Sequence, residues 1–527
     1  MSIWKKLLLV AFFVPTTLKP DIEFDELDEL DFDGKPEHIT RSAFNKVDAY
    51  NWLIDIAKAN ELLAEDLYSQ TYFLNKRPIY TSPIFLNLHT EQLYQNRTFN
   101  VSAFYNETPK MKFTKPSSAI SSYLKLGPDE GFIPFFRDKL NKQLISQLPI
   151  DIPQTIGLFT GAKVQQRRLG FMLQFLKSVN NFTVEVSTPL MYQERNYFFS
   201  DDERKNIKDY LGEADKEEQE RIIRKHFVAD KFGIGDTRIK LSHQFAERKK
   251  FCGRIGAQII LPTGFAFKNG LYGSKFRHEI MDRPQVDLCK MVTLAIDTTQ
   301  KDIDAVAQMG MDLGYNTIDW LSAILLDTPL GHDKHFAIGC FLETSFNLDR
   351  FIKLDSVISL DFIIPKTEDR FFQKKKNPAL FSDDRFIDLD ETDPDDIPIA
   401  KELIKFLNEQ AVETFFPLPY KSFVNPGFMF QFTVGPKITI RDWTFNFGYD
   451  FWYRQKEKIN PIFGMPSEPL VKSQNTRCYQ NKIFGSAKFN KIGECRDWSV
   501  CLNAEHTPSS SGIGKDFTFA LGFQVNF

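Results

Sequence analysis

The sequence lacks the features of a helical membrane protein and of a disulfide-rich domain. Beyond Val14 it has no apolar run of the roughly 18 residues that a transmembrane helix needs. Its six cysteines are scattered and include no C-x-x-C pair, so no disulfide framework is indicated. The net charge of −3 does not indicate affinity for nucleic acid. If the chain enters a membrane, it must do so as strands.

The N-terminus is typical of a secreted protein. Lys5 and Lys6 precede a short apolar run from Leu7 to Val14, which predicts a signal peptide over residues 1–20. The cleavage position is not defined, and a retained anchor or a buried helix stays an alternative. Residues 21–97 form an N-terminal extension, acidic at first and then partly helical. The sequence leaves open whether this extension is a plug or a periplasmic segment.

From residue 98 to residue 527, apolar and polar residues alternate in repeated segments. In DTRIKLSHQF, for example, Ile239, Leu241 and Phe245 share one face, and Arg238 and Lys240 share the other. Strict alternation predicts half-buried strands rather than helices. We count about twelve strands, within a range of 12–14. One predicted turn lies at residues 435–437 (GPK), between GFMFQFTV and ITIRDWTF.

The connections between these strands alternate between short and long along the chain. The long ones are predicted as inserts at 109–160, 199–232, 263–334 and 365–425, several with helix-like patterns. This arrangement, with an even strand number, is typical of an outer-membrane barrel, whereas a soluble β-sandwich is the alternative that alternation alone permits.

Aromatic residues favour the barrel because they cluster at strand ends. Trp443 and Trp498 follow short turns, Phe346 and Phe351 flank another, and Tyr453 lies at the far end of its strand. Such rings settle at the two membrane interfaces. The predicted fold is an all-β membrane barrel of about 12 (12–14) antiparallel strands, with helical extracellular loop inserts and an N-terminal extension.

The polar faces of the strands supply candidate lumen-lining residues of both charges. By alternation these are Glu185, Arg238, Lys240, Arg254, Gln258, Glu343, Lys353, Asp355, Asp361, Asn446 and Asp450. They could line a polar channel with weak charge selection, or they could fill the lumen with cross-barrel ion pairs. A filled or plugged lumen is slightly favoured, because the extension has no other obvious place to go.

An enzyme is the rival class, but the sequence offers little for it. His243 falls on the outer face near a short turn. His332 and His335 flank Asp333 at a spacing that could bind a metal, but polar loop residues are the simpler interpretation. No catalytic signature of a barrel phospholipase is present. We predict no enzyme activity, no cofactor and no metal.

The C-terminus resembles the insertion signal of Gram-negative outer-membrane barrels. Phe527 is terminal and aromatic, Val525 precedes it by two positions and Gly522 by five, whereas the usual polar residue before this glycine is Ala520 here. The resemblance implies an outer-membrane location, contact with lipid, and recognition of the last strand by the barrel-assembly machinery.

Residues 232–264 also resemble two strand ends of FadL-like and MetA-pathway-like barrels, which are implicated in the passage of hydrophobic compounds. The matching positions are Gly233, Gly235, Asp236, Pro262, Thr263 and Gly264. The predicted function is therefore a channel or transporter for small solutes, hydrophobic ones among them. The alternative is a structural or adhesive barrel with a plugged lumen that presents extracellular loops. No nucleic-acid partner is expected, and the cargo is not defined.

The C-terminal signal can be tested with Phe527→Ala. The variant should still form strands, but less of it should reach the outer membrane, because the assembly machinery would lose the terminal ring. The measurement is the amount of folded protein in outer-membrane fractions under overexpression. Assembly at the wild-type level would contradict the prediction.

Overall fold

The computed structural model describes a strand-rich core of the chain. The described residues are 76–86, 97–112, 163–198, 228–248, 250–270, 330–332, 334–374, 419–461, 470–472, 475–491 and 497–527, with isolated positions between 217 and 412. The predicted signal peptide and most of each predicted insert lie outside these residues. No helix in the described part is long and apolar enough to cross a membrane.

A closed antiparallel barrel forms the body of the described structure. Of the fourteen strands in the main sheet, β4 and β7 lie outside the ring, and twelve form the wall. The wall strands are β1 (Arg97–Lys112), β2 (Lys163–Val179), β3 (Phe182–Phe198), β5 (Thr237–Arg248), β6 (Phe251–Leu261), β8 (Ala337–Asn347), β9 (Ile352–Ile363), β12 (Phe428–Ile440), β13 (Trp443–Arg454), β16 (Cys478–Lys491), β17 (Asp497–Ser511) and β18 (Phe517–Asn526).

The ring closes where the last strand meets the first. β18 pairs with β1 from Thr98↔Asn526 to Glu107↔Phe517, and β1 pairs on its other side with β2. Each wall strand therefore has two antiparallel neighbours, and the ring has no edge. The predicted fold class and the count of twelve strands are confirmed.

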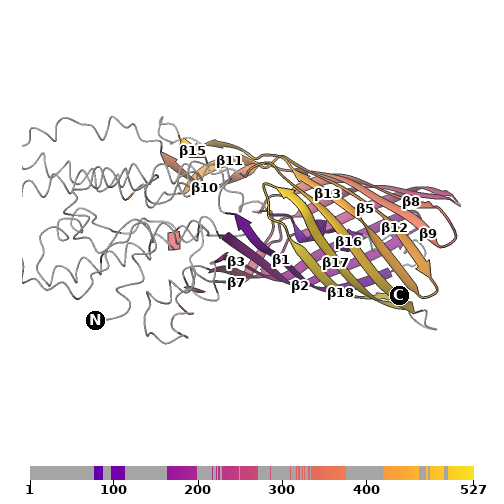
Figure 1. Ribbon diagram of the computed structural model, residues 1–527. Helices are drawn as coiled ribbons and strands as arrows, with labels where there is room; N and C mark the ends of the chain where they lie inside the picture. The colour runs from indigo at the N-terminus through magenta and orange to yellow at the C-terminus, as the bar shows by residue number, and fades with distance from the viewer. Residues whose placement is uncertain are drawn as a thin grey trace, which may run out of the picture.

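Six further strands lie outside the barrel wall. β4 (Val228–Ile234) and β7 (Phe265–Asn269) continue from β3, and β10 (Lys366–Lys374), β11 (Pro419–Asn425), β14 (Lys458–Pro461) and β15 (Leu470–Lys472) form a separate four-stranded sheet. Figure 1 shows β10, β11 and β15 at this end and the C-terminus at the opposite end. The described ends of the predicted inserts are mainly strands, and the few described positions within the segments expected to be helical, such as Glu217 and Trp320, are helical.

Side chains alternate between the outer face and the lumen along each wall strand. In β18, Phe519, Leu521 and Phe523 are exposed, whereas Thr518 and Gln524 are buried. Similar apolar residues are exposed around the whole ring. Because a belt of this extent would be unstable in water, it is the surface of a barrel that spans a membrane.

Aromatic side chains contact one another toward both ends of this belt. At the short-turn end, the ring of Phe489 lies 5.2 Å from that of Trp443 and 6.1 Å from that of Trp498. Toward the other end, the rings of Phe451 and Tyr479 are 6.3 Å apart. The two girdles have the composition expected at the two membrane interfaces.

The turn predicted at residues 435–437 is wrong. β12 runs through these residues to Ile440, and the turn follows at Arg441 and Asp442, where Arg441 has a φ of 53°. Pairing with β13 passes from Val434↔Tyr449 to Lys437↔Asn446, which leaves Pro436 without a partner on that side. The missing N–H of Pro436 is therefore tolerated inside the strand.

Gly448 of β13 provides a test of lumen packing. A Cβ there would lie 2.3 Å from the Val434 carbonyl oxygen and 2.7 Å from the Phe484 ring. Gly448→Val should destabilise the barrel by about 1–3 kcal/mol through overpacking. The measurement is the heating midpoint of the folded electrophoretic band.

The control is Gly485→Ala, because a Cβ on Gly485 would meet nothing closer than 3.9 Å. This variant should keep the wild-type midpoint. Equal midpoints for Gly448→Val and wild type would show that Val434 and Phe484 leave room for a side chain at position 448.

Candidate functional site

A short N-terminal segment lies inside the barrel. Residues 76–86, hereafter the plug segment, contain the 3-10 helix η5 (Ile79–Thr81) and the single turn α2 (Pro83–Leu86). Arg77, Tyr80 and Phe85 are all buried. No residue of the plug segment pairs with a described strand, so the segment is held by side chains rather than by the sheet.

Side chains of the wall satisfy the carbonyl groups that the short helical turns leave unpaired. The donors come from three strands and surround the segment. They are Arg168 to Arg77 O (2.8 Å), Gln174 to Phe85 O (3.2 Å), Arg238 to Tyr80 O (3.0 Å) and Gln431 to Thr81 O (2.7 Å).

The plug segment also covers an apolar part of the lumen. Ile79, Ile84 and Phe85 pack in one buried cluster with inward-facing wall residues. The rings of Phe85 and Phe104 lie 5.8 Å apart at 72°. The wall members of this cluster include Phe104, Met172, Met191, Ile260, Met429, Trp452 and Phe484. Without the segment, these side chains would face the lumen.

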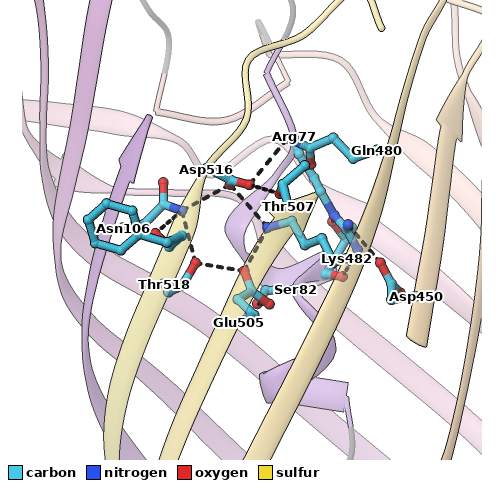
Figure 2. Close-up of polar contacts among 12 residues, drawn as sticks. Arg77, Ser82, Asn106, Asp450, Gln480, Lys482, Glu505, Thr507, Asp516 and Thr518 are labelled. Atoms are coloured by element: carbon cyan, nitrogen blue, oxygen red, sulfur yellow. Dashed lines mark hydrogen bonds and ion pairs between the residues drawn. The ribbon is translucent and has the colours of Figure 1, made fainter. Parts of the chain in front are cut away.

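On one side of the plug segment, a single lysine joins two carboxylates. Lys482 Nζ lies 2.7 Å from Glu505 Oε1 and 3.0 Å from Asp516 Oδ2. Ser82 of the plug segment donates to Glu505 Oε2 at 2.5 Å, as Figure 2 shows. All four side chains are buried, so water screens these charges little.

Across the lumen, a ladder of charges links neighbouring strands. Glu185 lies 3.2 Å from Arg238 and 3.8 Å from Lys240. Lys240 continues to Glu343 at 3.3 Å, and Glu343 to Arg254 at 3.9 Å. These contacts join β3, β5, β6 and β8. The charges alternate in sign, so each of the two carboxylates lies between two cations.

The structure places the predicted lumen residues as follows. All are buried except Lys353, which is half-buried near the short-turn end. Asp355 lies 3.9 Å from Lys437, and Gln258 donates to Asp361 at 2.5 Å. Their part in selecting a solute stays a prediction.

The residues that carry the FadL-like resemblance meet at one end of the lumen. Thr263 donates to the Gly235 carbonyl at 3.1 Å, and Gly264 N donates to Asp236 Oδ1 at 3.2 Å. Asp236 Oδ2 accepts from His332 N at 2.6 Å and lies 2.9 Å from His332 Nδ1. The two strand ends are thus tied together through Asp236.

His332 and His335 are buried, which their interpretation as polar loop residues did not foresee. The Tyr80 hydroxyl lies 3.2 Å from the His332 ring nitrogens, so His332 connects Asp236 with the plug segment. His335 Nδ1 lies 2.8 Å from the Ile364 carbonyl. Within the described part of the chain, no group of three or more His, Cys, Asp or Glu side chains could hold a metal ion.

Sequence reasoning missed several members of the site. Lys482 and Glu505 lie on the inward faces of β16 and β17, where alternation could have found them. Arg77 and Ser82 lie in a segment with no strand or helix period, so no pattern marks them. Only their partners on distant strands define their role.

Comparisons with known proteins give a likeness of overall shape. No family model and no curated protein matches the sequence. An outer membrane channel from Pseudomonas putida F1 is 7% identical, with 82% of this chain and 96% of that chain covered and a TM-score of 0.38. The toluene transporter TbuX of Ralstonia pickettii is 10% identical, with 82% and 90% covered and a TM-score of 0.28.

The translocator domain of the autotransporter NalP from Neisseria meningitidis is 6% identical, with 83% and 91% covered and a TM-score of 0.30. At such identities and scores, function has to be argued from the lumen of this chain itself.

Lys482→Met tests how far the barrel depends on the shared lysine. The change would leave Glu505 and Asp516 buried without their shared cation, with only Arg168 at 3.9 Å from Asp516, and should cost about 3–5 kcal/mol. The measurement is the unfolding midpoint in urea. Lys488→Met is the control, because Lys488 donates to the neutral Gln524 at 3.2 Å and its loss should cost less. Equal losses would argue against the role of the carboxylate pair.

Proposed function

We propose that this chain is an outer-membrane channel whose lumen is closed by the plug segment. The observation that carries the proposal is that the wall is complete without the segment. Every wall strand has both neighbours, and none of the pairs involves residues 76–86. The plug segment can therefore leave its place while the backbone hydrogen bonds of the barrel stay intact.

The proposed path is polar, with an apolar zone. A twelve-stranded ring lies between the eight-stranded barrels that side chains fill and the open sixteen-stranded porins. When the plug segment moves, the lumen would expose the charge ladder and the apolar side chains around Phe104 and Met429. Small solutes could pass, and the apolar zone favours hydrophobic ones among them.

The location is inferred from the same features. The apolar belt, the two aromatic girdles and the short turns at one end favour the outer membrane of a Gram-negative-type bacterium. The terminal Phe527, exposed on the outer face at the end of β18, is consistent with recognition by the barrel-assembly machinery. Lipid is the partner of the outer belt.

A structural or adhesive barrel is the second candidate, because the lumen residues are buried in the described state. This candidate requires the plug segment to stay in place permanently. The two functions therefore differ in whether removal of the segment's contacts opens a conducting path.

Planar-bilayer recording separates the two functions. The matched proteins are the wild type and a variant in which residues 77–86 are replaced by Gly and Ser at equal length. The variant should show stepwise conductance that the wild type shows rarely, because the chain would lose its contacts with the wall. Heat-unfolded protein is the control and should be silent. A silent but folded variant would favour the structural barrel.

A further inference from the structure

Asp450 of β13 forms part of a site that the wall builds without the plug segment. Its Oδ1 atom accepts hydrogen bonds from Gln431 Nε2 at 2.7 Å and from Thr433 Oγ1 at 2.6 Å. Both donors lie on the neighbouring strand β12. They fix the carboxylate and leave its other oxygen, Oδ2, to face the lumen. Arg77 Nη1 lies 2.7 Å from this oxygen.

Trp452 adds an aromatic surface to the same site. It lies two residues beyond Asp450 in β13, so both side chains point inward. The guanidinium carbon of Arg77 lies 5.6 Å from the centroid of the Trp452 ring. Asp450 and Trp452 are both fully buried. A fixed carboxylate beside an aromatic face is the combination that binds a planar, weakly hydrated cation.

Arg77 couples this site to the fold of the plug segment. Its Nε donates to Thr81 Oγ1 at 3.0 Å, and its Nη2 donates to the Thr81 carbonyl at 2.6 Å. The group bound at Asp450 thus also holds the turn of η5. Figure 2 shows Arg77 reaching from the plug segment toward Asp450 on the wall.

The geometry points to a receptor site for guanidinium-type organic cations at Asp450 and Trp452, occupied in this structure by Arg77. A solute with a guanidinium group would compete with Arg77 and so release the N-terminal half of the plug segment. A metal ion is disfavoured, because Asp450 Oδ1 is already used by two donors and only Oδ2 faces the site. The release step rests on the proposed channel function; the binding site itself does not.

Chemical rescue of Arg77→Ala in the full chain tests the site. The variant leaves a cavity lined by Asp450 and Trp452, and its channel should be open at least about ten times as often as the wild type, because a buried ion pair is broken. Ethylguanidinium at low millimolar concentration should fill the cavity. It should then raise the heating midpoint of the folded band and reduce the open time. Ethylurea, which is neutral and of similar shape, should do neither.

Two control variants locate the effect. Arg77→Ala combined with Asp450→Asn should not respond to ethylguanidinium, because the carboxylate is gone. Ser82→Ala weakens the plug segment at Glu505 instead and keeps Arg77 at Asp450, so ethylguanidinium should neither raise its heating midpoint nor reduce its open time. A response of either control equal to that of Arg77→Ala would overturn the proposal.

The two readouts distinguish this site from the channel function. A rise in midpoint without any current in any variant would support the site and contradict the channel. Currents in Arg77→Ala with no effect of ethylguanidinium on midpoint or open time would contradict the site and leave the channel standing. If Arg77→Ala does not fold, its refolding yield with ethylguanidinium and with ethylurea gives the test. Equal yields would overturn the proposal.

Discussion

The pairing of β18 with β1 is the constraint on which the rest of the structure depends. In hydrocarbon, an unpaired backbone N–H or C=O costs several kcal/mol, so a sheet in a membrane must close on itself. The register from Thr98↔Asn526 to Glu107↔Phe517 achieves this closure. Once the ring is closed, the alternation of side chains assigns one face to lipid and the other to the lumen. The backbone has no pairing left to offer, so anything inside the lumen has to be held by side chains.

Much of the wall could be predicted from sequence because its signal is local. A period of two residues marks each strand, and the same period marks Asp450 or Lys240 as inward-facing. The turn predicted at residues 435–437 is wrong for a physical reason. Glycine and proline usually mark turns, but here Gly435 lies opposite Gly448, and Pro436 falls where the β12–β13 ladder is interrupted. Which of these two roles a Gly-Pro pair has depends on the partner strand, and the local sequence does not specify that partner.

The plug segment could be suspected from sequence but not located. It has no amphipathic period, and its turns are stabilised by groups far away in the chain. Tyr80 and His332 are separated by 252 residues, and Ser82 and Glu505 by 423. The link between Asp236 and His332 has the same origin, because it joins a strand end to a distant loop. Such contacts follow from the closed ring, since closure brings distant strands to a common lumen.

The buried charges of the lumen fall into two kinds, and the difference bears on opening. The ladder through Glu185, Lys240 and Glu343 joins strands whose geometry the backbone already fixes, so its pairs persist whether or not the plug segment is present. Lys482 likewise keeps both of its carboxylates. Asp450 differs, because the cation in contact with it is Arg77 of the plug segment. Without the segment, Asp450 would keep its donors on β12, whereas Lys482, which lies opposite on β16, is paired with Glu505 and Asp516. Because an uncompensated buried carboxylate is costly, the contact between Arg77 and Asp450 adds to the wall hydrogen bonds, the Ser82–Glu505 contact and the apolar cluster that keep the lumen closed. Water or solute that replaces the plug segment would therefore have to solvate or bind the carboxylate of Asp450.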